Sequence, residues 1–138
     1  MKIRYNFGIL KNSIIYFKFS IDGNPFCIGG KLVKVEQDKE LYKFIFENDK
    51  KFGINENTFL HMQIKYSDNI LYFEETDNQR LISGLFGFTM FETFGFPYEL
   101  SDEILAGMNF DLDIEGVENL RKFQKDKFKS TFKKKTSF

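Results

Sequence analysis

The chain carries few residues of the types that catalysis requires. His61 is the single histidine, and it falls on the polar face of an expected strand, so we predict a surface histidine. Cys27, the single cysteine, lies between two apolar residues, which favours a buried and inert thiol. The segment 111–116 matches the first half of a calcium-binding loop, but Lys122 stands where the loop needs its bidentate acid. We therefore predict no catalytic residue, no metal site, no cofactor and no enzymatic activity.

Basic residues concentrate at the end of the sequence. From 121 to 138 there are eight basic residues and one acidic residue, whereas the other 120 residues hold 12 basic and 19 acidic ones. Such an asymmetry is typical of an arm that contacts phosphates, an acidic partner or the acidic body of the same chain. The alternative is a solvated terminus that only keeps the protein soluble. The candidate contact residues are Arg121, Lys122, Lys125, Lys129, Lys133, Lys134 and Lys135.

The elements that must position these residues divide the chain into two parts. In 1–80, apolar residues alternate with polar ones and tight polar turns follow, which predicts consecutive strands. We expect an antiparallel β-meander of six or seven strands, closed into a small barrel or a curled sheet. The expected strands are 3–9, 15–21, 26–35, 41–47, 51–54, 60–66 and 70–75.

The period changes after Gln79. The segment 81–94 has helical spacing, and Pro97 ends it. Ser101 is the expected N-cap of a second helix, and Asp113 that of a third, whose apolar side would include Phe128. The fold class is therefore α+β: a β-meander body (1–80), then a helical segment with a basic tail (81–138) that has two or three helices. Without a linker between them, we expect one folded unit.

A family resemblance begins in the second part. Phe91–Leu100 reads FETFGFPYEL, and it is followed by Ser-Asp-Glu-Ile, then Asp-Ile-Glu-Gly-Val and then Gln-Lys. This series resembles the C-terminal helical segment of the aminoacylation core of alanyl-tRNA synthetases, where the phrase is Asp-Thr-Tyr-Gly-Phe-Pro. The resemblance covers residues 88–129, and residues 1–80 carry none that we recognise.

The resemblance implies a role in holding RNA. In that family the acid of the phrase reaches the minor groove near the G·U pair of alanine tRNAs, and Glu92 occupies that position here. Thr93, Gly95, Phe96 and Pro97 would form the structural corner behind it. The chain is too short for the family's ATP-binding sheet and lacks the zinc ligands of its editing domain. We therefore expect neither activation of alanine nor deacylation of tRNA.

Two partner classes remain open. One is a tRNA acceptor stem or another structured RNA, contacted by Glu92 and the basic residues above. The other is a protein. In that case this chain would be a protein-binding or inhibitory module, of the immunity type or phage-encoded, and the corner would serve only as scaffold. No apolar run is long enough to span a membrane, and the start of the chain has no signal-peptide core. We expect a cytoplasmic protein with no membrane partner, and the sequence leaves its oligomeric state open.

Overall fold

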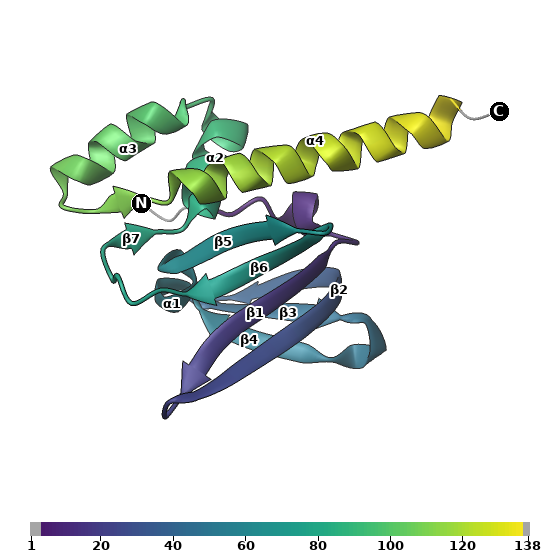
Figure 1. Cartoon of the computed structure of the whole chain (residues 1–138), viewed down its shortest axis with the longest axis horizontal. Coiled ribbons are helices and arrows are strands. Elements are labelled where there is room, and N and C mark those ends of the chain that lie inside the picture. Colours follow the sequence, from purple (N-terminus) through teal and green to yellow (C-terminus); the bar gives the residue numbers. More distant parts are fainter. Residues whose placement is uncertain (1–3, 137–138) are drawn as a thin grey trace.

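The structure, a computed structural model, describes the backbone of residues 4–136 and the side chains of residues 4–129. It has the predicted α+β class, because a six-stranded sheet comes first and most of the helical residues follow it (Figure 1). The strands lie in the order β4-β3-β2-β1-β6-β5. Their bounds are β1 Ile14–Ile21, β2 Asn24–Asp38, β3 Leu41–Phe46, β4 Lys51–Asn55, β5 Met62–Ser67 and β6 Ile70–Glu75.

The sheet is mixed rather than the wholly antiparallel meander that the alternation predicts. β1 to β4 are antiparallel neighbours in chain order, but β1 also pairs in parallel with β6. The helix α1 (Glu56–Leu60) follows β4, and the β5–β6 hairpin then joins the sheet on the other side of β1. β4 and β5 are consequently the two edges, and the sheet does not close into a barrel. Alternation of apolar and polar residues predicts where strands occur, but it does not predict which strands pair with one another.

The strand expected at 3–9 is absent from the described residues 4–9. Residues 4–6 have no regular structure, and Phe7–Leu10 form a 3₁₀ helix, η1, whose N-cap Asn6 accepts a hydrogen bond from the Gly8 N–H at 3.1 Å. The alternation there reflects anchoring in the core: Tyr5 is buried, and its ring packs edge-on against Phe59 at 5.6 Å.

Aromatic rings fill the concave side of the sheet. Phe17, Phe44 and Phe73 from three strands surround Phe59 of α1, with ring centroids 4.7–6.3 Å apart in the contacting pairs. Each such pair contributes about 0.5–1.5 kcal/mol beyond the burial of its area. The sequence pattern does not predict α1, which is only five residues long and begins after its N-cap Asn55.

Three helices follow the sheet, as expected: α2 (Gly84–Phe94), α3 (Tyr98–Gly107) and α4 (Ile114–Thr136). The short strands β7 (Leu81–Ile82) and β8 (Asp111–Leu112) pair in parallel and bracket α2 and α3. Where α2 crosses α4, a Cβ on Gly84 would lie 2.5 Å from the backbone of Gly116 and Val117. The glycine is therefore required by the close approach of the two helices.

Two expectations about these helices are wrong. Ser101 is not an N-cap, because α3 begins three residues earlier behind Pro97 and buries Ser101 within it. Phe128 does not join the apolar side of α4, since 69% of its surface is exposed, whereas Val117, Leu120 and Phe123 are buried. In Figure 1, α4 extends beyond the sheet towards its C-terminal end.

Candidate nucleic-acid interface

The corner between α2 and α3 contains the four residues that the resemblance assigns to it, Thr93, Gly95, Phe96 and Pro97. Thr93 lies in the last turn of α2, and Gly95 ends the helix in the left-handed conformation with φ +71°. The Gly95 N–H donates to the Phe91 carbonyl at 3.0 Å, and the Phe96 N–H donates to the Met90 carbonyl at 3.3 Å. Pro97 then caps α3. A glycine is favoured at position 95 because other residues strain at this φ.

Side chains of α4 fix that helix against the edge of the sheet. Asp113 is the predicted cap: its Oδ1 accepts from the Gly116 N–H at 3.0 Å, and its Oδ2 accepts from the Ile64 N–H of β5 at 3.1 Å. Asn119 Nδ2 donates to the Ile64 carbonyl at 2.9 Å. Burial raises the pKa of the Asp113 carboxyl, although its two backbone hydrogen bonds lower it. The N–H and the carbonyl of Ile64, which lie on the open edge of β5, thus both have hydrogen-bond partners on α4 or its N-cap.

Lys127 holds the other half of α4. Its Nζ donates to the carbonyls of Ile9, at 2.9 Å, and of Lys11, and burial lowers the pKa of the amine. This lysine belongs to the basic end of the sequence, but the contacts make it a structural clamp between α4 and the start of the chain.

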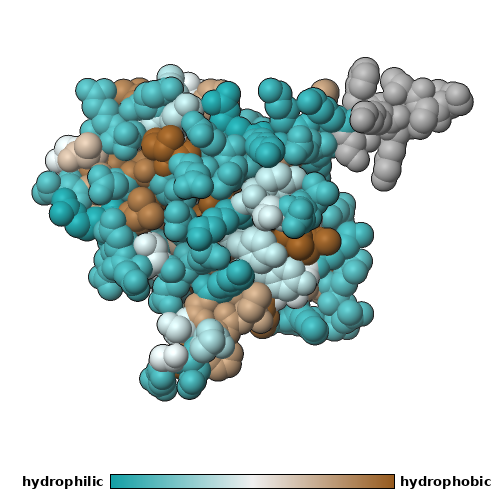
Figure 2. All heavy atoms as spheres, viewed as in Figure 1, coloured by the Kyte–Doolittle hydropathy of each residue, from teal (hydrophilic) through white to brown (hydrophobic). Residues whose placement is uncertain are grey.

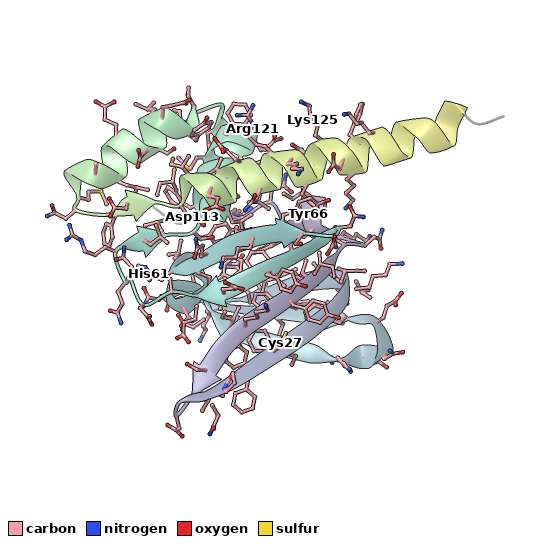
Figure 3. All side chains as sticks on the ribbon, viewed as in Figure 1. Cys27, His61, Tyr66, Asp113, Arg121 and Lys125 are labelled. Carbon is pink, nitrogen blue, oxygen red and sulfur yellow. The ribbon has the colours of Figure 1, made fainter. Side chains whose placement is uncertain are left out.

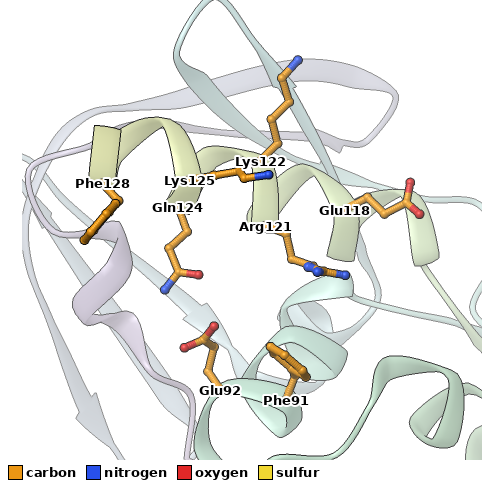
Figure 4. Close-up of a pocket in the computed structure, with 8 residues that line it drawn as sticks. All are labelled: Phe91, Glu92, Glu118, Arg121, Lys122, Gln124, Lys125 and Phe128. Carbon is orange, nitrogen blue, oxygen red and sulfur yellow. The ribbon is translucent and has the colours of Figure 1, made fainter. Parts of the chain in front are cut away.

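A groove of about 700 Å³ lies between the end of α2 and the outer side of α4 (Figure 4). It brings Glu92 of α2 together with Arg121, Lys122 and Lys125 of α4, four residues that the sequence singles out. The complete lining is Phe91, Glu92, Glu118, Arg121, Lys122, Gln124, Lys125 and Phe128. In Figure 4 the Glu92 carboxylate points across the groove towards Gln124.

Aromatic rings position the cations of the groove. The Arg121 guanidinium lies 5.7 Å from the ring centroids of both Phe91 and Tyr98, and Lys122 Nζ lies 6.0 Å from that of Tyr66. Such contacts hold a charged group by the ring's quadrupole and leave its N–H groups available to a ligand. Glu92 is exposed and has no hydrogen-bond or ion-pair partner among the side chains of 4–129. The groove therefore presents two exposed carboxylates, Glu92 and Glu118, beside the three cations Arg121, Lys122 and Lys125.

The other predicted contact residues lie outside the groove. Lys129 is exposed on α4 but is not part of the lining. Lys133, Lys134 and Lys135 fall in the last turns of α4, and their side chains lie outside the described residues. Their role stays a prediction.

Sequence reasoning about charge missed four of the lining residues: Phe91, Glu118, Gln124 and Phe128. Positions 118, 121, 125 and 128 follow at intervals of three and four, which places them on one face of a helix. That spacing could have predicted which residues of α4 line the groove. Phe91 and Gln124 belong to the synthetase-like segment, although charge alone does not single them out.

The structure also locates the residues considered for catalysis. His61 is half-buried at the end of α1, with its Nδ1 3.2 Å from the Leu81 carbonyl. Cys27 is exposed on β2, so the expectation of a buried thiol is wrong. Among the described residues, no group of three or more His, Cys, Asp or Glu side chains could hold a metal ion. No described helix is both long enough and apolar enough to cross a membrane.

Comparison with known proteins shows similarity to part of the alanine–tRNA ligases. The chain is 32% identical over 107 residues to that of Mesomycoplasma hyopneumoniae (strain 7448), covering 78% of this chain and 12% of the relative. It is 29% identical over 93 residues to that of Lactobacillus johnsonii, covering 67% of this chain and 10% of the relative. With Prochlorococcus marinus (strain MIT 9515) it is 40% identical over 55 residues, which are 40% of this chain and 6% of the relative.

The predicted resemblance is therefore confirmed, and it is wider than the quoted motifs. An alignment of 107 residues is longer than the whole of 81–138, so it also includes part of the β body. The chain nevertheless spans only 12% of the length of that relative. No protein-family model matches the chain, and no solved structure matches it.

Proposed function

We propose that this chain is a non-catalytic RNA-binding module whose groove between α2 and α4 holds a tRNA acceptor stem or another structured RNA. One observation carries the proposal: Glu92, Arg121, Lys122 and Lys125 line the same groove within the synthetase-like segment. The relatives are named alanine–tRNA ligases, which makes tRNA the first RNA to test. A cytoplasmic setting is part of the proposal, because that is where tRNA is charged.

The chemistry of the groove suits the minor groove of an RNA helix. That groove is wide and shallow and displays base edges and 2′-hydroxyls, so proteins recognise it by shape, backbone contacts and a few hydrogen bonds. Guanine offers an amino donor there, and the exposed Glu92 carboxylate can accept from it. Arg121 and Lys125 across the groove would pair with the flanking phosphates and offset the repulsion between phosphates and Glu92.

A titration of labelled acceptor minihelices tests the proposal. We expect micromolar binding at low salt that weakens as salt rises, because each phosphate contact releases counterions. Arg121→Ala and Lys125→Ala should each weaken binding equally for all stems and reduce the salt slope by about one. Glu92→Gln should instead change the preference between a stem with a G·U pair and one with G·C at the same position.

Lys50→Ala provides the matched control, since Lys50 is an exposed lysine on the β body, before β4 and outside the groove. It removes one positive charge and should leave binding unchanged. If Lys50→Ala weakens binding as much as Lys125→Ala does, the groove is not the site. Binding that is absent at low salt, or indifferent to salt, contradicts RNA binding altogether.

A second candidate, a protein-binding module, rests on an exposed apolar row along α3 and its C-cap, Met108. Leu100, Ile104 and Met108 follow at intervals of four and are 40%, 53% and 57% exposed. Acidic residues border the row, and α3 contains no basic residue. By charge complementarity, the partner that fits this face is a basic amphipathic helix of another protein.

A synthetic leucine–lysine amphipathic peptide, with a leucine–glutamate peptide as control, tests this second candidate. The basic peptide should bind, the acidic peptide should not, and Ile104→Ser should weaken the binding. Equal binding of both peptides, or no effect of Ile104→Ser, would remove the candidate. The row lies outside the groove lining, so Ile104→Ser should leave RNA binding intact.

A further inference from the structure

Two tyrosines stand side by side on the outer face of the sheet, away from the aromatic core. Tyr16 of β1 and Tyr72 of β6 are register partners, with ring centroids 6.1 Å apart and ring planes 23° apart. Both side chains are half-buried, unlike the fully buried Phe17 and Phe73 that follow them in the same strands. Part of each ring is therefore open to solvent on a face that no helix covers (Figure 1).

The strand on the other side of Tyr16 places no side chain beside its ring. The register partner of Tyr16 on β2 is Gly29, which has no side chain. A Cβ at this position would collide with the carbonyl oxygen of Ile15, so the backbone itself excludes every other residue. On its β2 side, Tyr16 therefore faces backbone and no other side chain.

Lysines border the tyrosine pair. Lys18 Nζ lies 4.4 Å from the ring centroid of Tyr72, and Lys65 is the register partner of Tyr72 on β5. Both lysines pair with Glu74, at 3.5 Å and 2.9 Å. Lys31 of β2 is exposed and is the register partner of Ile14, the residue two positions before Tyr16. Figure 2 shows this face with paler surface among hydrophilic teal.

We propose that Tyr16 and Tyr72 form a platform on which unpaired bases of the bound RNA stack, while Lys18, Lys31 and Lys65 contact the phosphates between them. Exposed aromatic rings on an open sheet, with cations along the strand path, are what proteins use to hold single-stranded nucleic acid. The inference rests on the proposed function, since it concerns the unpaired end of an RNA whose helix lies in the α2–α4 groove.

The platform and the groove lie on neighbouring elements, and one RNA with an unpaired tail would have to reach both. Lys122 lines the groove and also lies over Tyr66 of β5. β5 is the neighbour of β6, which carries Tyr72. The helix α4 packs along β5 (Figure 3), so α4 and the strand β5 separate the groove from β6 and its Tyr72.

The test compares one RNA stem in two forms, a blunt stem and the same stem with a short unpaired 3′ tail. The tail should tighten binding by about fivefold to 150-fold for each base that stacks. Tyr16→Ala and Tyr72→Ala should remove this gain and leave the blunt stem unchanged. Tyr16→Phe keeps the ring and should keep the gain, which separates stacking from a folding defect.

Cys27 supplies an independent readout, because it is exposed and is the register partner of Lys18 beside the platform. The tailed RNA should slow alkylation of Cys27, and the blunt stem should not. Equal affinity for the two RNAs, or Tyr16→Ala weakening both equally, overturns the platform while the groove stands. A chain that binds a free single strand but no stem would refute the groove and keep the platform.

Discussion

Asp113 is expected to hold the helical segment on the sheet, and replacing it by alanine measures how strongly. The carboxylate is 4% exposed and accepts two backbone hydrogen bonds, one from α4 and one from β5. Losing a helix cap costs about 1 kcal/mol. Leaving the buried Ile64 N–H without a partner costs about 1–3 kcal/mol more. We therefore expect Asp113→Ala to lower the free energy of unfolding by about 2–4 kcal/mol, a large part of a typical domain's stability.

Urea denaturation followed by far-ultraviolet circular dichroism measures this loss. Asp111→Ala is the matched control: it removes an exposed carboxylate two positions earlier and should change the free energy of unfolding by less than about 0.5 kcal/mol. Asn119 binds the carbonyl of the same Ile64 residue, so the double variant tests the coupling. We expect Asp113→Ala and Asn119→Ala to be non-additive by at least about 0.5 kcal/mol. A loss below about 1 kcal/mol for Asp113→Ala would refute the anchoring.

Two further predictions concern the sheet and the helix crossing. Burial raises the pKa of the Glu74 carboxyl, but Lys65 and Lys18 outweigh this and hold that pKa below its ordinary 4.5. Glu74 therefore stabilises the fold above about pH 4.5, and this contribution disappears as pH falls through the lowered pKa. Glu74→Gln should flatten the acid limb of a stability–pH curve, and an unchanged curve would contradict the ion pairs. Gly84→Ala should destabilise by about 1–3 kcal/mol, because its Cβ meets the α4 backbone. Gly107→Ala, where a Cβ meets nothing within 4 Å, is the control, and urea denaturation of the two variants measures the difference.

The sequence predicts the class and most elements of this fold, because they depend on local pattern. The alternation in β1, β3 and β6 and the glycine and proline of the α2–α3 corner are local signals, and the structure confirms them. The parallel β1–β6 pair is not local: its partners, such as Phe17 and Phe73, lie far apart in sequence. The prediction of a strand at 3–9 was also wrong because it used local pattern alone. Tyr5 is apolar because its ring packs in the core, and not because its segment pairs with a neighbouring strand.

The groove could be predicted in part. The resemblance singles out Glu92, and the charge asymmetry singles out Arg121, Lys122 and Lys125, but neither places them opposite one another. That placement depends on how α4 packs against α2, and the two helices approach closely at Gly84. Lys127 shows why a count of charges is not enough: it belongs to the same basic run, yet it is half-buried and donates to the backbone carbonyls of Ile9 and Lys11.

The parallel pairing of β1 with β6 has a consequence for the order in which the chain acquires structure. β1 to β4 can form by successive hairpins, each between neighbours in sequence, and this closes only short loops. The β1–β6 contact encloses everything between Ile14 and Ile70, so its loop-closure entropy is the largest in the sheet. During synthesis, β1 therefore keeps one unpaired edge until β6 has left the ribosome, and that edge is where a nascent chain is exposed to misassociation.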